Sequence, residues 1–338
     1  MLEHGGKLRQ AAALFNIELE NWIDLSTGIN PYGWKVGNIP ANCWSRLPED
    51  EDGLLATAKR YYNTEHLLAV AGTQAAIQII PGLLRKRRVG MLSPTYSEHV
   101  QAWEAAGHEV ISLGPTQIDE HIDSLDILVL VNPNNPTANL FSQSRMLGWH
   151  EKLKARNALF IVDEAFIDPT PEASLVSIKA RPNLIILRSI GKFFGLAGIR
   201  AGFVHAQPHI LNELQRKLGP WSIAGASRYV AEQALMDIEW QEQTRIELSL
   251  HAARLNNLLL GAGFNPTGSN TLFQWVKTSR AHTIYQSLAK KGILVRYFAQ
   301  PSSVRFGLPG TEPQWQRLEQ ALENLRAYLA ELEETDLA

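Results

Sequence analysis

The 338-residue sequence lacks several features that mark whole classes of protein. Its single cysteine, Cys43, excludes an intrachain disulfide and a cysteine-based zinc site. No apolar run approaches the length of a membrane span, and the N-terminal segment lacks the composition of a secretory signal. The ten histidines show no spacing typical of metal ligands. These absences predict a cytoplasmic protein with no metal site and no membrane partner.

An excess of charge of one sign is also missing. The net charge is −2, from 32 Lys and Arg against 34 Asp and Glu, so nothing in the overall charge points to nucleic acid. We interpret the one short basic run, residues 85–88, as a solvated turn. A hydrophobic content of 45% is ordinary for a globular protein, and the length suffices for about two domains with a large core.

Short apolar runs alternate with segments of helical period between Leu67 and His205. Most of the runs show no polar alternation, which is typical of strands covered on both faces. The pattern predicts an α/β fold in which a mostly parallel sheet is wrapped by helices. The predicted strands are residues 67–71, 89–92, 125–131, 159–162, 184–187 and 202–205.

The C-terminal part of the sequence predicts a smaller α+β domain. A helix over 208–240 is expected to break near Gly219-Pro220, and further helices are expected over 242–260, over 281–291 and from Thr311 onward. Strands are expected over 271–276, 293–298 and 304–308. The predicted domains are an N-terminal arm (1–35), a large domain (36–215), an interdomain helix (216–240) and a small domain (241–338).

One lysine stands among small residues in the segment that follows the fifth predicted strand. Lys192 has Ser189 three positions before it and Arg200 eight positions after it. A lysine amine can bind covalently to the aldehyde of pyridoxal 5'-phosphate (PLP), while a serine and an arginine can bind the phosphate of that cofactor. The segment therefore predicts a PLP anchor at Lys192.

Other polar residues follow the predicted strands in the same way. Gly72-Thr73-Gln74, Tyr96, Asn135 and Asp163 each come just after an apolar run. Ligands of open α/β sheets lie outside the carboxyl ends of the strands, so one pocket could collect all these segments.

These motifs, in this order, resemble the aminotransferase-like PLP enzymes of fold type I. The resemblance implies a homodimer and gives each residue a role. Gly72, Thr73 and Gln74 would open a helix toward the cofactor phosphate, and Tyr96 would stack on the pyridine ring. Asn135 would donate to the ring hydroxyl oxygen, and Asp163 would pair with the pyridine nitrogen. Lys192, Asp163 and Tyr96 are thus the expected catalytic residues.

Within that group, four segments resemble the threonine-phosphate decarboxylases of cobalamin biosynthesis. The segments are His4-Gly-Gly-Lys-Leu-Arg9, Asp24-Leu-Ser-Thr-Gly-Ile-Asn-Pro31, Asp163-Glu-Ala-Phe166 and Pro220-Trp-Ser222. The resemblance implies a phosphorylated amino acid as substrate, L-threonine O-3-phosphate, which would lose CO2 to give (R)-1-aminopropan-2-ol O-2-phosphate. It also implies a substrate site made of His4, Gly5, Gly6, Lys7, Gly28, Ile29, Asn30, Arg296 and Arg305.

Several residues depart from the family pattern. Phe166 stands where related histidinol-phosphate aminotransferases usually have tyrosine, Gly191 replaces a common hydroxyl, and Ala138 replaces a glycine. Leu47 replaces a tyrosine that many relatives send across the dimer to the phosphate. The other candidate functions are a non-catalytic PLP-binding protein and an aminotransferase, such as one acting on histidinol phosphate, which would share the cofactor residues and also needs a phosphate-bearing substrate. Phe166 and the segment that starts at His4 favour the decarboxylase.

Overall fold

A computed structural model describes residues 4–176 and 181–336 of the chain. These residues form two compact units. Unit 1 consists of the residues up to Tyr32, Pro136–Ala138 and the residues from Ile246 onward. Unit 2 consists of Gly33–Asn135 and Asn139–Arg245. The N-terminal arm therefore belongs to the same compact unit as the C-terminal strands.

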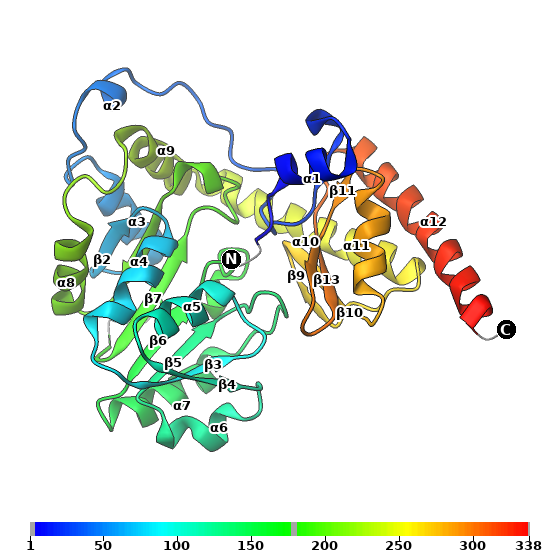
Figure 1. Cartoon of the computed structure of the whole chain (residues 1–338). Helices are drawn as coiled ribbons and strands as arrows, with labels where there is room; N and C mark the ends of the chain where they lie inside the picture. The colour runs from blue at the N-terminus through cyan, green and yellow to red at the C-terminus, as the bar shows by residue number, and fades with distance from the viewer. Residues whose placement is uncertain (1–3, 177–180, 337–338) are drawn as a thin grey trace. The chain divides into compact units, whose positions relative to one another are not determined.

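The described part of unit 2 is built on a seven-stranded sheet (Figure 1). The strand order is β2-β8-β7-β6-β5-β3-β4. Neighbouring strands from β4 to β7 pair in parallel, whereas β8 pairs antiparallel with both β7 and β2. The strands are β2 (Leu67–Val70), β3 (Arg88–Leu92), β4 (Glu109–Leu113), β5 (Ile127–Val131), β6 (Leu159–Asp163), β7 (Leu184–Ser189) and β8 (Gly202–His205). The predicted mostly parallel α/β sheet is confirmed.

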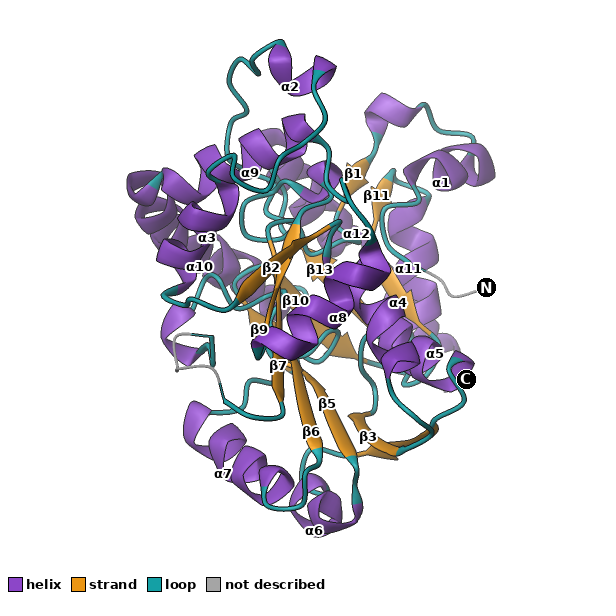
Figure 2. Ribbon diagram, turned by 90° about the vertical axis from the view of Figure 1, so that its left-hand side faces the viewer, coloured by secondary structure: helices purple, strands orange, loops and turns teal. Residues whose placement is uncertain are grey.

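Helices pack on this sheet in a layer that includes α4, α5 and α8 (Figure 2). Ile77 of α4, Trp103 of α5 and Leu214 of α8 belong to one buried cluster with strand residues such as Val129 and Ile161. The intervening strand residues are buried as well, which explains why the strands lack polar alternation. The helices of unit 2 are α2 (Asn42–Ser45), α3 (Leu54–Tyr62), α4 (Thr73–Ile79), α5 (Ser97–Ala105), α6 (Ile118–His121), α7 (Gln143–Lys154), α8 (Pro208–Leu218) and α9 (Gly225–Met236).

Unit 1 contains a four-stranded antiparallel sheet of order β12-β13-β10-β9 and a short parallel pair, β1 with β11. Its strands are β1 (Ile23–Asp24), β9 (Gly268–Asn270), β10 (Phe273–Lys277), β11 (Ile293–Leu294), β12 (Arg296–Phe298) and β13 (Ser303–Gly307). Its helices are α1 (Leu8–Phe15), α11 (Ala281–Ala289), α12 (Glu312–Asp336) and most of α10 (Ile238–Gly261).

The N-terminal arm is anchored within unit 1 by apolar packing. Ala11 of α1 and Trp22 form a buried cluster with Ala289 of α11 and Leu294 of β11. Ile23 and Asp24 pair in register with Ile293 and Leu294. Residues 8–24 of the arm are thus packed into the unit.

Three details of the predicted elements were wrong. Strand β4 was missed because it lies at the edge of the sheet, where Glu109 and Ser112 are exposed and interrupt the apolar run. The predicted strand over 293–298 divides into β11 and β12, which join different sheets. The break between the two long helices falls at Asp237, earlier than expected. No helix within the described ranges combines the length and the apolar character needed to span a bilayer.

Candidate active site

The carboxyl ends of the central parallel strands bring several predicted site residues to one edge of the sheet in unit 2. Asp163 is the last residue of β6 and lies in register with Val131 of β5 and Leu187 of β7. Its carbonyl oxygen accepts a hydrogen bond of 2.8 Å from the backbone N–H of Asn132. Ser189 ends β7, so Lys192 follows at the same edge.

The Asp163 carboxylate is buried, with 2% of the residue exposed, and both of its oxygens have partners. The backbone N–H of Ala165 donates to Oδ1 at 3.0 Å. The imidazole Nε2 of His99 lies 2.9 Å from Oδ2. The sequence analysis did not identify His99. A usable signal was its position three residues after Tyr96, because a helix that begins directly after Tyr96 carries His99 in its first turn.

Tyr96 lies at the start of α5 with its ring half-buried. Its hydroxyl donates to Gln74 Oε1 at 3.3 Å, and Gln74 Nε2 donates to Glu98 Oε2 at 2.6 Å. Burial, followed by the negative charges of Glu98 and Asp163, raises the pKa of Tyr96 to about 12, and the charge of Arg200 opposes this shift. Tyr96 therefore lies within electrostatic reach of both Asp163 and Arg200.

Gly72 and Arg200 come together where α4 begins, an arrangement that we call the Gly72–Arg200 cradle. Gly72 precedes the helix with a φ of +72°, a conformation that favours glycine. A Cβ atom at Gly72 would come within 2.7 Å of Arg200 Nη2, so the absence of a side chain is what lets the guanidinium lie here. Likewise, a Cβ atom at Gly202 would lie 3.0 Å from the backbone nitrogen of Thr73. The cradle thus combines a helix start with a cation.

Lys192 and Phe166 approach each other in the same unit. The Lys192 Nζ lies 5.4 Å from the centroid of the Phe166 ring. Phe166 carries no hydroxyl, so Asn135 is the residue predicted to donate to a ring oxygen. The neighbouring Asn134 accepts from Thr95 Oγ1 at 2.8 Å and donates to Pro94 O at 2.9 Å, which ties the loop after β5 to the loop after β3.

These residues of unit 2 fit PLP by their chemistry. Lys192 supplies an amine for the aldehyde, Asp163 a buried carboxylate for the pyridine nitrogen and Tyr96 an aromatic face. The Gly72–Arg200 cradle supplies cationic and N–H groups for the phosphate. Ser189 fits less simply, because its Oγ already accepts a hydrogen bond of 3.2 Å from Gly191 N. That oxygen can still donate its proton to a phosphate.

In unit 1, the arm and the C-terminal strands line a cavity of about 260 Å³. The lining includes the predicted substrate residues His4, Gly5, Lys7 and Arg296, together with others that the sequence analysis missed, including Ser26, His282 and Tyr285. Two cationic side chains in a small cavity suit an anionic group such as a phosphate.

Ser26 connects the arm to the strands. Its Oγ accepts a hydrogen bond of 2.8 Å from the backbone N–H of Gly6 and donates to Asp24 Oδ1 at 2.6 Å. Its carbonyl oxygen accepts from Arg305 Nη2 at 2.6 Å. A Cβ atom at Gly5 would collide with the same carbonyl, which explains the need for glycine. Ser26 lies inside the Asp24–Pro31 motif, so the sequence contained it but did not single it out.

Arg296 and Arg305 occupy paired positions on β12 and β13. Burial, together with the positive charge of Arg296, lowers the pKa of Arg305 to about 9, and Asp24 opposes this shift. The charged form of Arg305 is therefore destabilised where it stands. A bound anion would remove that penalty.

The remaining predicted substrate residues do not line the cavity. Gly28 takes a φ of +61°, and Ile29 is half-buried beside it. Asn30 is buried, and its Oδ1 accepts a hydrogen bond of 2.9 Å from Tyr32 N, which stabilises the turn. Arg9, whose charge was expected to help bind a phosphate, is exposed and also absent from the lining.

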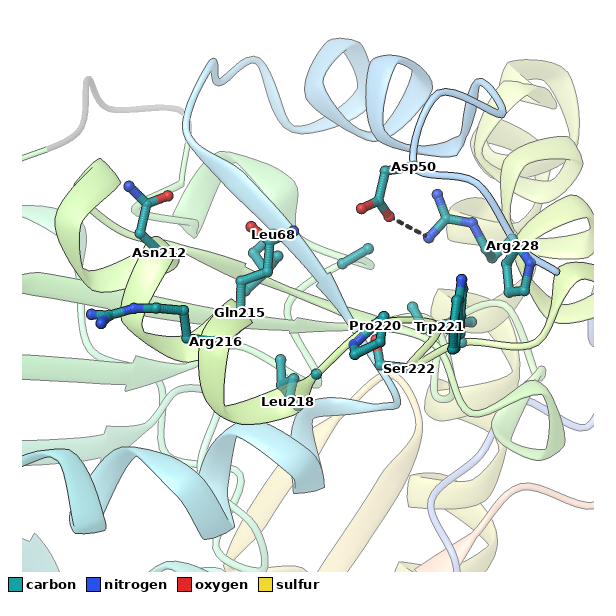
Figure 3. A pocket seen from close by; sticks show the side chains of 14 residues that line it. Asp50, Leu68, Asn212, Gln215, Arg216, Leu218, Pro220, Trp221, Ser222 and Arg228 are labelled. Atoms are coloured by element: carbon teal, nitrogen blue, oxygen red, sulfur yellow. Dashed lines mark hydrogen bonds and ion pairs between the residues drawn. The ribbon is translucent and has the colours of Figure 1, made fainter.

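Another cavity, of about 840 Å³, lies in unit 2 (Figure 3). None of the predicted cofactor residues lines it. Leu68, Gln215, Leu218 and Trp221 are among its lining residues. Arg228 and Asp50 also line it, and the two form an ion pair of 3.4 Å. No group of three or more potential metal ligands exists among the residues that the structure describes.

Comparison with known proteins identifies relatives over nearly the whole chain. The model of the aminotransferase class I and II family matches residues 21–324. A threonine-phosphate decarboxylase of Pseudomonas aeruginosa is 48% identical over 95% of this chain and 97% of its own. One from a Sinorhizobium species is 37% identical over 94% of this chain and 97% of its own.

Solved structures share the fold. The histidinol-phosphate aminotransferase of Sinorhizobium meliloti, solved in complex with PLP, matches with a TM-score of 0.81 and 17% identity. The match covers 97% of this chain and 99% of the other.

Proposed function

The chain belongs to the aminotransferase class I and II family, and from that membership we propose that it is a PLP-dependent threonine-phosphate decarboxylase. Its substrate would be L-threonine O-3-phosphate, and its products CO2 and (R)-1-aminopropan-2-ol O-2-phosphate, an intermediate of cobalamin biosynthesis. The observation that carries the proposal is 48% identity over 95% of the chain to a threonine-phosphate decarboxylase. The cationic cavity lined by the arm supports a phosphorylated substrate, a requirement that histidinol phosphate would also meet.

In unit 2, the proposed roles concern the cofactor. PLP, when bound, accepts the electron pair released as the bond between Cα and the carboxylate breaks. Lys192 would hold the cofactor through its aldehyde and later return a proton from Nζ to Cα. Asp163 would keep the pyridine nitrogen protonated, and Tyr96 would fix the plane of the ring. Gly72, Thr73, Gln74, Ser189 and Arg200 would bind the phosphate, and Asn135 the ring hydroxyl.

In unit 1, the proposed roles concern the substrate. Arg305 would bind the carboxylate that is to be lost, since a guanidinium can hold a carboxylate through charge-assisted hydrogen bonds. Lys7, His4 and Arg296 would bind the phosphate in the 260 Å³ cavity. Binding both ends of the substrate would fix its orientation in the site.

We also propose that the chain forms a homodimer through a surface of unit 2. Trp44, Leu47 and Trp221 are exposed by 69%, 63% and 60%, which is unusual for side chains of this size. The segments that carry the two tryptophans are adjacent, because a Cβ atom at Gly225 would touch the carbonyl of Cys43 at 2.7 Å. Sedimentation analysis of the wild type and of a Trp44→Ser/Trp221→Ser variant tests this surface, with a shift to monomer expected for the variant.

An assay with and without an acceptor tests the proposed reaction. With L-threonine O-3-phosphate and PLP but no keto acid, the protein should release CO2 continuously. Transfer of the amino group only when 2-oxoglutarate is present would instead identify an aminotransferase, and no turnover under either condition would identify a non-catalytic binding protein. Reduction of the loaded protein with borohydride, followed by peptide mapping, should find the cofactor on Lys192.

A further inference from the structure

A cavity of about 600 Å³ in unit 2 lies apart from the residues of the proposed reaction. Tyr62, at the end of α3, and Arg188 of β7 are among its lining residues, and we call it the Tyr62–Arg188 cavity. Its described lining includes none of the residues proposed to bind the cofactor or the substrate. Because successive side chains of a strand point to opposite faces of a sheet, Arg188 points away from the face of Ser189.

Two buried donor atoms of this cavity lack a hydrogen-bond partner. The Tyr62 hydroxyl and Arg188 Nε have none among the residues that the structure describes, although Tyr62 and Arg188 are each only 2% exposed. The two side chains are adjacent, with Arg188 Cζ 4.6 Å from the centroid of the Tyr62 ring. A phenol and a guanidinium can both donate, and a buried donor without an acceptor is costly. The pair therefore suits a ligand that supplies acceptor atoms.

The rest of the Arg188 guanidinium is held by acidic residues. Nη1 donates to Glu164 Oε2 at 3.1 Å, and Nη2 donates to Asp168 Oδ1 at 2.5 Å. The Tyr61 hydroxyl donates to the same Asp168 oxygen at 2.9 Å. Glu164 and Asp168 are fully buried, and neither lines the cavity. The guanidinium is thus fixed, and Nε is the donor that it leaves for a ligand.

The charged residues of the described lining are all cationic. Arg60, which is exposed, and Arg245, which is half-buried, accompany Arg188. Since Glu164 and Asp168 balance the charge of Arg188, the attraction for an anion comes from Arg60 and Arg245. Much of the remaining lining is apolar and consists of Pro171, Val176, Leu235, Met236 and Ile238. A carboxylate attached to an apolar group matches the donors, the cations and the apolar walls together.

We propose that the Tyr62–Arg188 cavity is a binding site for a small carboxylate that carries an apolar group. The carboxylate would accept hydrogen bonds from the Tyr62 hydroxyl and from Arg188 Nε, and the apolar group would pack against the apolar part of the lining. The site uses no residue of the proposed reaction, so the inference does not depend on that reaction.

The probe is 4-fluorobenzoate, whose ¹⁹F resonance broadens on binding to the PLP-loaded protein. Its uncharged analogue, 4-fluorobenzamide, should show no broadening. Tyr62→Phe removes a hydroxyl that has no partner to lose, and Arg60→Gln removes a charge from an exposed position. Each should weaken binding of the probe about tenfold. Arg188 is left in place, because its loss would leave two buried carboxylates without their cation.

Two matched controls remove the same groups elsewhere in unit 2. Tyr229→Phe and Arg216→Gln alter residues that do not line the cavity, so both variants should bind the probe as the wild type does.

Arg305→Gln separates this cavity from the proposed substrate site, where a carboxylate is also expected to bind. That variant should keep the binding that Tyr62→Phe weakens. If the broadening disappears in Arg305→Gln and persists in Tyr62→Phe, the probe binds at the substrate site and the inference is overturned. Absence of broadening, or equal broadening of the benzamide, would also overturn it, because the cavity would then hold only water or bind apolar groups without regard to charge.

Discussion

Arg296 and Arg305 are register partners on the antiparallel strands β12 and β13, which places two guanidinium groups on one small sheet. Their surroundings differ. Arg305 is buried and donates to the carbonyl of Ser26, whereas Arg296 is half-buried and lines the cavity shared with Lys7. The difference suggests separate anionic partners, a carboxylate for Arg305 and a phosphate for Arg296.

Substitution of each arginine should separate these two roles. Arg305→Gln should weaken binding of both threonine phosphate and threonine by about tenfold or more, because both ligands carry the carboxylate. Arg296→Gln should weaken only threonine phosphate. Spectral titration of the PLP-loaded protein measures both affinities. Equal losses for the two ligands in Arg296→Gln would show that Arg296 does not discriminate the phosphate.

Two cationic residues of the N-terminal arm, Lys7 and Arg9, offer a test of the proposed phosphate site and its control. Lys7→Gln should weaken threonine phosphate binding about tenfold, the loss expected for one charge-assisted contact, and should leave the weak binding of threonine unchanged. Arg9→Gln removes the same charge two residues away, but Arg9 does not line the cavity. An equal loss in both variants would mean that the arm acts through its overall charge and not through a site.

The strands and the residues at their ends were predictable because buried parallel strands leave an unmistakable apolar run. Asp163 at the end of β6 and Ser189 at the end of β7 are examples. Contacts between distant segments were not predictable. The pair His99–Asp163 spans 64 residues, and Arg305–Ser26 spans 279. A single sequence shows the period of each element but not which side chains meet once the elements pack.

Gly72 provides a test of the phosphate cradle. Gly72→Ala should cost about 1 kcal/mol or more of stability, because φ is +72°, and should also displace Arg200 and weaken PLP binding about tenfold. Gly107→Ala is the control: its φ is +83°, but its Cβ would meet nothing within 4 Å. That variant should lose stability and keep its PLP affinity, as measured by equilibrium dialysis. Unchanged PLP affinity in Gly72→Ala would move the phosphate site elsewhere.

His205 gives the fold a predictable pH dependence. Burial lowers the pKa of His205 from its usual 6.5 to about 4, and Nδ1 lies 2.8 Å from Thr64 Oγ1. Between these two values the unfolded chain binds a proton that the folded chain does not. The stability contributed by neutral His205 is therefore present above pH 6.5 and is lost as the pH falls toward 4.

The loss from this residue between pH 7 and pH 5 should be about 2 kcal/mol. Urea unfolding of His205→Asn at both pH values should show a drop in stability that is smaller than the wild-type drop by about that amount, even though the variant starts from a lower stability at pH 7. His209→Asn, which removes an exposed histidine a few residues away, should retain the wild-type drop. If His205→Asn loses as much stability as the wild type on acidification, the acid sensitivity belongs to other groups.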